Sequence, residues 1–237
     1  MHAVRLSRFT IALALLATWN ASAEITVYYL RHGQGGHNID AEYVRKNVPK
    51  MEWTNWMDRV GNSRVFTPKG EAQVQTLVNE LRPFRFDLIA VSPKWRARNT
   101  ILPFLKATGR TAEIWPELLE TGMVGDDSER AARQVGSHFF DGVSDIKFPE
   151  EEQAYFHLRA DGSGNRALNP TNAAEAGALA RRVESLLHTT FGTNDVNVLL
   201  VGHGTAGLTL IRRLTRNPGA AARMMDNARL WMAREKA

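Results

Sequence analysis

Residues 25–38 read Ile-Thr-Val-Tyr-Tyr-Leu-Arg-His-Gly-Gln-Gly-Gly-His-Asn, and this stretch decides the fold. Residues 25–30 are β-branched, aromatic or aliphatic and stop before a cluster of glycines, which is typical of a buried strand entering a tight turn. Arg31 and His32 follow at the end of that strand, where glycines let the backbone approach a ligand closely. A fixed cation beside an imidazole suits phosphate, so the stretch predicts an anion site at this strand end.

A second short buried strand is predicted over 86–91, and Ser-Pro-Lys-Trp-Arg-Ala-Arg-Asn-Thr follows it directly. Ser92 is expected to cap a helix and Pro93 to begin it, because serine caps helices well and proline suits the first helical position. Arg96 then falls in the first turn, where its guanidinium can reach an anion at the strand ends. Arg98 is predicted to lie on the surface.

A third buried strand is predicted over 196–201, and it ends in Gly-His-Gly-Thr-Ala-Gly with His203 between two glycines. In an open α/β sheet the carboxyl ends of parallel strands line one crevice. The three predicted strand ends would therefore bring two guanidinium groups, Arg31 and Arg96, together with two imidazoles, His32 and His203.

The rest of the pattern alternates helices with irregular segments. Thr67 before Pro68 is an N-cap followed by a helix-starting proline, which predicts a helix over 67–82. Further predicted elements are a helix entry over 34–47, an irregular loop over 48–65, an edge strand over 113–115, and helices over 171–190 and 208–216. A last strand is predicted over 229–234, with a helix over 230–233 as the alternative.

Four blocks of this sequence resemble, in order, the motifs of the histidine phosphatase superfamily in its phosphoglycerate-mutase-like branch. They are Arg-His-Gly at 31–33, Thr-Pro-Lys-Gly-Glu-Ala-Gln at 67–73, Ser-Pro-Lys-Trp-Arg-Ala-Arg-Asn-Thr at 92–100, and His203 between its glycines. The resemblance implies an α/β fold: a three-layer α/β/α sandwich with a mostly parallel central sheet and an inserted cap region. Residues 24–237 would form one catalytic domain, with the cap at about 123–171.

The resemblance also implies a metal-independent phosphatase that needs no cofactor. His32 would take the phosphoryl group as a phosphohistidine. Arg31, Arg96 and His203 would bind that group, and Asn38 would contact the substrate. The spacing of His32 and His37, five residues, does not suit a metal pair on one helix face, so no zinc site is predicted.

The proton donor is expected in the loop after 113–115. The family places a carboxylate there in a Leu-x-Glu context, which Glu120 fits, and Glu117 is its rival because the register of a loop is uncertain by a few residues. The phytase-like branch instead follows its second histidine with an aspartate proton donor. Here that position holds Gly204, which returns the acid role to the loop.

Residues 1–23 have the pattern of a secretory signal. Arg5 and Arg8 precede a short apolar core over 9–19, and Ala-Ser-Ala follows as a cleavage site before Glu24. An uncleaved anchor is the alternative, but a bilayer span needs about 20 apolar residues. The sequence thus predicts a secreted or periplasmic protein with no stable membrane anchor after cleavage, and its lack of cysteine means that the fold relies on its core.

Charge and composition favour a small phosphorylated substrate over a nucleic acid. The net charge is only +5, and the basic residues are scattered along the chain. A nucleic-acid binder would instead gather its basic residues into a stripe. Two alternatives remain. A phosphoglycerate-mutase-type phosphotransferase fits less well, because glycolytic intermediates are cytosolic whereas residues 1–23 predict export. In addition, Gly35 and His37 stand where the family often has Ser or Thr and an aromatic residue. A non-catalytic phospholigand-binding protein would usually have lost one of the key histidines or arginines, and all are present.

Overall fold

The computed structural model describes residues 24–120, 148–160, 173–192, 194–220 and 225–236. The predicted signal segment, and the expected cap apart from 148–160, lie outside the described residues.

Within the described residues, six strands form one sheet in the order β4-β3-β2-β5-β1-β6. All neighbouring pairs are parallel except β1 with β6, which is antiparallel. The strands are β1 (Glu24–Arg31), β2 (Leu88–Val91), β3 (Ala112–Ile114), β4 (Phe156–His157), β5 (Val196–Gly202) and β6 (Leu230–Lys236).

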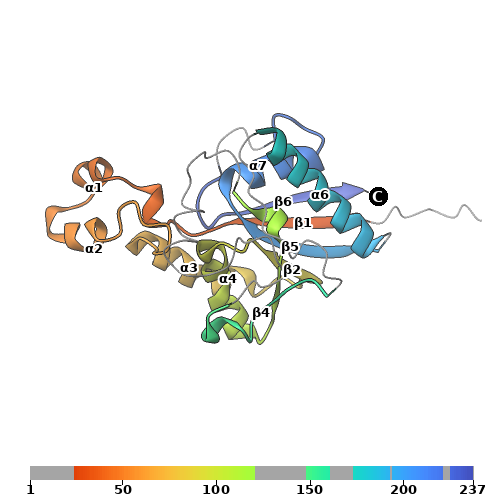
Figure 1. The fold of residues 1–237 in the computed structure, drawn as a ribbon, viewed down its shortest axis with the longest axis horizontal. Helices are drawn as coiled ribbons and strands as arrows, with labels where there is room; N and C mark the ends of the chain where they lie inside the picture. The colour runs from red at the N-terminus through yellow and green to blue at the C-terminus, as the bar shows by residue number, and fades with distance from the viewer. Residues whose placement is uncertain (1–23, 121–147, 161–172, 193, 221–224, 237) are drawn as a thin grey trace, which may run out of the picture.

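Helices cover both faces of this sheet, which makes a three-layer α/β/α sandwich (Figure 1). Helices α3 (Pro68–Leu81) and α4 (Trp95–Thr108) lie on one face, and α6 (Ala173–Phe191) and α7 (Gly204–Leu214) lie on the other. The predicted fold class is therefore confirmed.

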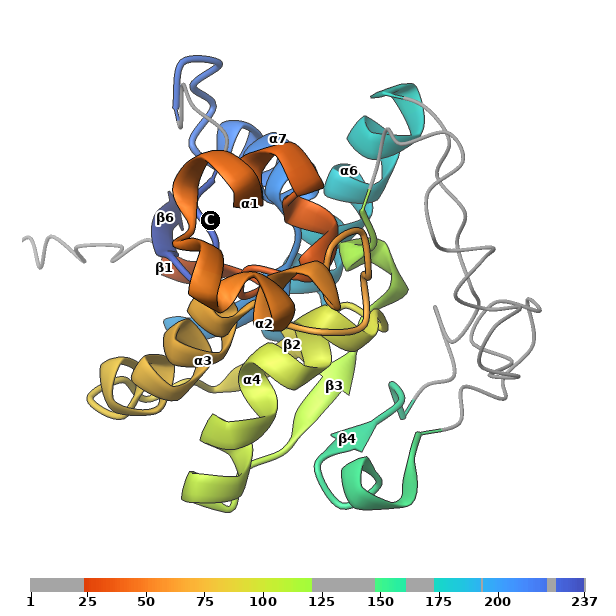
Figure 2. The same ribbon diagram turned by 90° about the vertical axis from the view of Figure 1, so that its left-hand side faces the viewer.

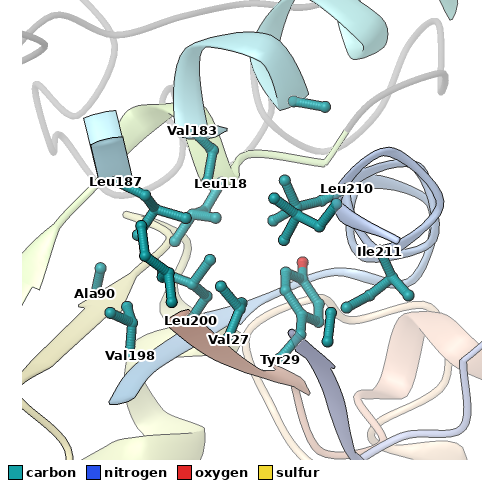
Figure 3. Close-up of a cluster of buried hydrophobic side chains, with 14 of the residues drawn as sticks. Val27, Tyr29, Ala90, Leu118, Val183, Leu187, Val198, Leu200, Leu210 and Ile211 are labelled. Atoms are coloured by element: carbon teal, nitrogen blue, oxygen red, sulfur yellow. The ribbon is translucent and has the colours of Figure 1, made fainter. Parts of the chain in front are cut away.

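Alternation of side chains along β1 feeds both hydrophobic cores, because successive residues of a strand point to opposite faces. Leu30 packs in the core under α3 and α4, whereas Val27 and Tyr29 pack in the core under α6 and α7. Figure 3 shows the second core, where Leu210 of α7 and Val183 of α6 meet the sheet. Burying each such aliphatic side chain contributes roughly 1.5–3 kcal/mol.

The register of the sheet puts three strand ends beside one another. Arg31 of β1 pairs with Gly202 of β5, and Val91 of β2 pairs with Val201 of β5. Because these strands are parallel, the residues that follow them emerge at one edge of the sheet.

The segment after β1 extends away from the sheet (Figures 1 and 2). It contains the 3-10 helices η1 (Gly36–Asn38) and η2 (Lys50–Glu52) and the helices α1 (Ala41–Asn47) and α2 (Trp53–Met57). The prediction of an irregular loop over 48–65 is thus wrong in its first part. Trp56 and Val44 bury each other in a small separate core, and that contact holds the two short helices together.

Two other local predictions need correction. Helix α4 begins at Trp95 rather than Pro93, and Lys94 occupies its N-cap position without a side-chain cap. Strand β3 is not at the edge, because the short strand β4 pairs outside it. By contrast, Thr67 caps α3 as predicted, its Oγ1 accepting the Gly70 N–H at 3.0 Å.

The connection after β3 is the 3-10 helix η3 (Pro116–Leu118), and η4 (Glu150–Glu152) precedes β4. None of the helices among the described residues combines the length and apolar character that a bilayer crossing requires.

Candidate active site

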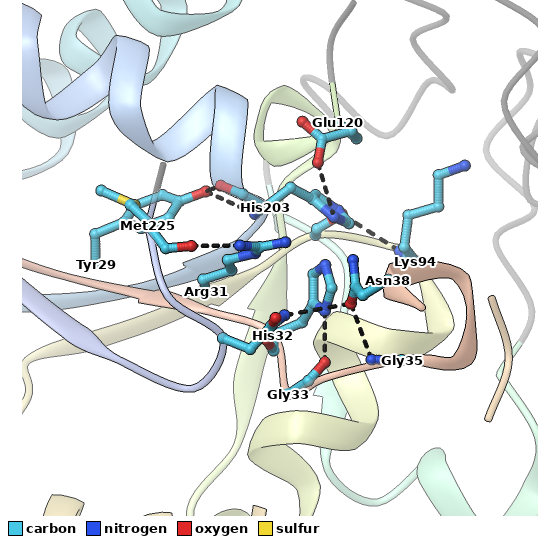
Figure 4. Close-up of polar contacts among 12 residues, drawn as sticks. Tyr29, Arg31, His32, Gly33, Gly35, Asn38, Lys94, Glu120, His203 and Met225 are labelled. Atoms are coloured by element: carbon cyan, nitrogen blue, oxygen red, sulfur yellow. Dashed lines mark hydrogen bonds and ion pairs between the residues drawn. The ribbon is translucent and has the colours of Figure 1, made fainter. Parts of the chain in front are cut away.

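The adjacent ends of β1 and β5 bring His32 and His203 together. The backbone N–H of His32 donates to the backbone carbonyl of Gly202 at 3.0 Å, which continues the β1–β5 ladder one residue beyond strand β1. The two imidazole rings are 5.3 Å apart between centroids and inclined at 63°. Figure 4 shows the two rings side by side. Both are buried, with exposed fractions of 1% and 0%.

The hydrogen bonding of His32 fixes its tautomer. Nδ1 lies 2.7 Å from the Gly33 carbonyl oxygen, and because a carbonyl can only accept, Nδ1 carries the proton. Burial, followed by the charge of Arg96, lowers the pKa of His32 well below its usual value, so the ring is neutral. Nε2 therefore holds a free lone pair.

Tyr29 fixes the backbone at His203. Its hydroxyl donates to the His203 carbonyl at 3.0 Å and accepts the His203 N–H at 2.8 Å. Glycines make room for the ring, since a Cβ at Gly202 would lie 2.3 Å from the Tyr29 hydroxyl and one at Gly207 would lie 2.1 Å from Cε1. Sequence reasoning assigned Tyr29 only to the strand, although the glycines that flank His203 were a signal of close packing there.

Ser92 fixes the ring of His203. Its Oγ lies 2.9 Å from Nε2 of His203 and accepts the Lys94 N–H at 3.4 Å. The buried Ser92 O–H has one acceptor among these contacts, Nε2, so it donates there and leaves the ring proton on Nδ1. Burial, followed by the charge of Arg96, lowers the pKa of His203 well below its usual value and keeps the ring neutral. Ser92 is thus a partner of His203, and the prediction that it caps the helix is wrong.

The two rival carboxylates lie in different surroundings. Glu120 lies beside the ring of His203, with 3.8 Å between its Oε2 and Nδ1 of that ring (Figure 4). Glu117 is buried, and its carboxylate accepts hydrogen bonds from both terminal nitrogens of Arg159, at 2.9 and 3.0 Å. Of the two, Glu120 is the carboxylate that the fold brings to the histidines.

Both predicted arginines lie at the same edge of the sheet. Arg31 donates through Nη1 to the Met225 carbonyl, and a Cβ at Gly204 would lie 3.3 Å from its Cζ, so the start of α7 packs closely on the guanidinium. Arg96 is buried in the first turn of α4, and its charge contributes to lowering the pKa of Arg31 and of His32.

Thr100 ties this helix to the turn after β1. Its hydroxyl donates to the Arg96 carbonyl at 2.6 Å and accepts the Gly33 N–H at 2.9 Å. The helix that carries Arg96 and the turn that carries His32 therefore hold a fixed relation to each other.

Asn38 ends η1 and faces the same turn. Its Oδ1 accepts the Gly35 N–H at 3.0 Å and the Asn227 amide at 3.3 Å. Asn227 also donates to the His32 carbonyl at 3.0 Å. The oxygen of Asn38 is used within the turn, so its amide N–H groups are the part that can reach a ligand.

His37 is a site residue that sequence reasoning did not assign. Its ring lies 5.3 Å from the ring of His32, and its buried Nδ1 has no hydrogen-bond partner among the described residues. Burial, followed by the charges of Arg96, Arg31 and Lys94, lowers its pKa to about 3. The cluster thus combines neutral imidazoles with basic side chains, an environment suited to an anionic ligand. In the described part of the chain, no group of three or more His, Cys, Asp or Glu residues is arranged to hold a metal ion.

Comparison with known proteins gives a family and several similar folds. A profile described as Histidine phosphatase superfamily (branch 1) matches residues 27–233. A search of curated proteins finds no match.

Among solved structures, a candidate alpha-ribazole-5'-P phosphatase from Escherichia coli has a TM-score of 0.52 at 19% identity, covering 88% of this chain and 89% of that one. The alpha-ribazole phosphatase from Shigella flexneri has a TM-score of 0.51 at 19% identity, with 87% and 89% covered. A mycobacterial glucosyl-3-phosphoglycerate phosphatase, solved with VO3, has a TM-score of 0.50 at 18% identity, with 87% and 90% covered. At these identities the likeness is one of fold.

Proposed function

The chain belongs to the histidine phosphatase superfamily (branch 1), and we propose that it is a phosphomonoester hydrolase that works through a phosphohistidine on His32. The observation that carries the proposal is the pair of buried histidines with their hydrogen-bond partners, Gly33 and Ser92, from which we assign opposed tautomers. His32 presents a lone pair on Nε2, and His203, 5.3 Å away between ring centroids, presents an N–H on Nδ1. One ring can attack phosphorus while the other donates a hydrogen bond to an oxygen of the same group.

Binding would rely on positive charge and hydrogen-bond donors. Arg31, Arg96 and the Nδ1–H of His203 would contact the non-bridging oxygens, with Asn38 as a further donor. Such charge-assisted hydrogen bonds strengthen as charge shifts in the transition state, and phosphoryl transfer needs mainly position and positive potential from the protein. No metal ion enters this scheme.

In the first chemical step, the Nε2 lone pair of His32 forms a bond to phosphorus as the ester P–O bond breaks. Protonated Glu120 gives its proton to the departing alkoxide. In the second step, the Glu120 carboxylate removes a proton from water, the resulting hydroxide attacks phosphorus, and the N–P bond breaks to return His32. Acid–base help of this kind is worth roughly two to four orders of magnitude in rate.

A small phosphorylated molecule is the proposed substrate, and the names of the structural neighbours suggest the first members of a test panel. These are alpha-ribazole-5'-P and glucosyl-3-phosphoglycerate, to be compared with sugar phosphates, nucleotides and phytate.

We also propose export to the periplasm or beyond, on the pattern of residues 1–23. N-terminal sequencing of the protein from its host should find a start near Glu24. An intact Met1 on a cytosolic protein would contradict export and favour the mutase-type alternative.

The decisive assay uses the mature protein with a generic aryl phosphate in the presence of EDTA. Hydrolysis should persist with the chelator and should fall by at least about a thousandfold in His32→Ala, because the covalent route is then closed. The matched control is His157→Ala, which removes an exposed imidazole from β4 and should leave the rate unchanged. Full activity in His32→Ala, or its loss with EDTA in the wild type, would overturn the mechanism.

A further inference from the structure

Residues 148–160 are joined to the candidate site by two buried ion pairs. Glu152 binds Arg98 of α4 with 2.6 Å between Oε2 and Nε, and their side chains are 3% and 2% exposed. Arg159 binds Glu117 of η3 at 2.9 Å, with side chains 6% and 5% exposed. Helix α4 carries Arg96, and η3 is followed directly by the segment that carries Glu120. Each pair therefore anchors an element that holds one of the proposed functional groups.

The Arg159–Glu117 pair fixes η3 in orientation as well as in position. Its two parallel hydrogen bonds, at 2.9 and 3.0 Å, allow one relative arrangement of guanidinium and carboxylate. The Arg159 guanidinium also lies over the Trp115 ring, 5.6 Å from its centroid. The residue before η3 and the middle residue of η3 thus contact the same arginine.

The backbone between this ion pair and Glu120 has little conformational freedom. The Leu118 N–H donates to the Trp115 carbonyl at 3.0 Å, and the Leu119 N–H donates to the Pro116 carbonyl at 3.0 Å. Leu118 and Leu119 are both buried. A turn closed in this way transmits the orientation of Glu117 to the backbone of Glu120.

Stability alone gives a weak reason for such a pair. Removing two charges from water costs several kcal/mol for each ion, and replacing a buried pair by apolar side chains of similar volume is often neutral or stabilising. What an apolar pair does not supply is a fixed angle between the two groups.

We propose that Arg159 and Glu117 are positioning residues that hold Glu120 at the distance and angle required for proton transfer to the leaving group. This inference rests on the proposed function, in which Glu120 is the general acid. Proton donation matters most when the leaving group is a strongly basic alkoxide and least when it is a weakly basic aryl oxide. Loss of the pair should therefore slow alkyl phosphates selectively.

The test compares two double variants of the full mature enzyme. E117M/R159M removes both charges of the positioning pair. R98M/E152M is the matched control, because it removes the other buried pair of the same 148–160 segment, at α4 rather than at η3. E120Q is the reference for loss of the acid itself. For each variant, kcat/KM is measured on an aryl phosphate and an alkyl phosphate, and thermal unfolding reports folding.

We expect E117M/R159M to lose roughly ten- to a hundredfold on the alkyl phosphate and less than about threefold on the aryl phosphate, in the same direction as E120Q. R98M/E152M should change both substrates by a similar factor. The losses in E117M/R159M and E120Q should not multiply when combined, because both act through one carboxyl group. If E117M/R159M does not fold, Arg159→Lys, which keeps the charge but loses the two-pronged contact, should show the same selectivity.

Equal losses on both substrates in E117M/R159M or Arg159→Lys, or multiplicative losses with E120Q, would overturn the positioning role. If E120Q itself shows no selectivity, the acid assignment in the proposed function fails, and the positioning role fails with it. Selectivity in E120Q without selectivity in the pair variants removes the positioning role alone.

Discussion

Two regions meet on helix α4 and differ in the groups that surround a buried arginine. The paired region is Arg98 with Glu152, and the positive region is Arg96 with three histidines, His32, His37 and His203. Arg98 is matched within the protein by Glu152, with 2.6 Å between Nε and Oε2. Arg96, two residues earlier, lies among His32, His37 and His203, and its charge contributes to lowering the pKa of each of these imidazoles. The comparison teaches that burial alone does not identify a functional arginine. The charge of Arg98 joins α4 to the 148–160 segment, whereas the charge of Arg96 acts on three imidazoles.

The largest expected effect is a loss of folding stability when the ion pair of the paired region is removed. Glu152→Ala removes the carboxylate that contacts Nε of the buried Arg98, and it should lower the free energy of unfolding by about 3–5 kcal/mol. Urea unfolding would measure this. Glu150→Ala, an exposed neighbour in η4, should change stability by less than about 0.5 kcal/mol. A similarly small loss in Glu152→Ala would mean that the paired region is not a scaffold element.

Ligand binding is the next test, in the positive region. Arg96→Met should weaken binding of inorganic phosphate by about 1.5–3 kcal/mol, since it removes charge-assisted hydrogen bonds to the anion. Titration calorimetry would measure the affinity. Lys106→Met, an exposed cation in the last turn of α4, is the control and should bind phosphate as the wild type does. Equal effects of the two substitutions would show that only net charge matters.

The hydroxyl of Ser92 gives a smaller effect. Ser92→Ala removes the donor to Nε2 of His203, so that the ring proton can move, and should lower kcat/KM by about tenfold, which corresponds to about 1.4 kcal/mol. Nitrogen chemical shifts of the His203 ring would report the proton moving from Nδ1 toward Nε2. Thr108→Ala, which removes a hydroxyl at the last residue of α4, should leave both readouts unchanged. A ring of His203 that keeps its Nδ1 proton in Ser92→Ala would contradict the tautomer assignment.

The smallest expected effect is a pH dependence. The pKa of His37 is about 3 in the folded protein and near its usual value of 6.5 when unfolded. As pH falls through 6.5, the unfolded chain takes up a proton that the folded protein does not, so unfolding becomes easier. Between pH 7 and pH 6, His37 should account for a loss of about 0.7 kcal/mol, which should be missing in His37→Asn. Identical pH dependence in both proteins would remove His37 from the positive region.

Local sequence pattern was enough to predict the strands that deliver the site and the helices that cover them. Apolar runs that stop at glycines gave β1 and β5, and an N-cap before a proline gave α3. These signals lie within one element, so no tertiary contact is needed to read them.

Side-chain partners far apart in sequence were beyond this reasoning. Ser92 was predicted to cap a helix because its true partner, His203, is 111 residues away. Arg98 was predicted on the surface, yet it is buried against Glu152, 54 residues away. Glu117 and Glu120 were both candidates for the proton donor. What distinguishes them in the structure is Arg159, which binds Glu117 and lies 42 residues away in the sequence. Each case depends on which distant group the fold brings within hydrogen-bond distance.

Direct observation of the covalent intermediate tests the central claim most closely. The mature enzyme would be mixed with a phosphomonoester, quenched in base within one turnover, digested and analysed by mass spectrometry. The account predicts a phosphoryl group on Nε2 of His32, formed and lost at rates compatible with turnover and absent from His32→Ala. A phosphoryl group on His37 or His203, or active turnover with no phosphoenzyme at any time, would contradict it.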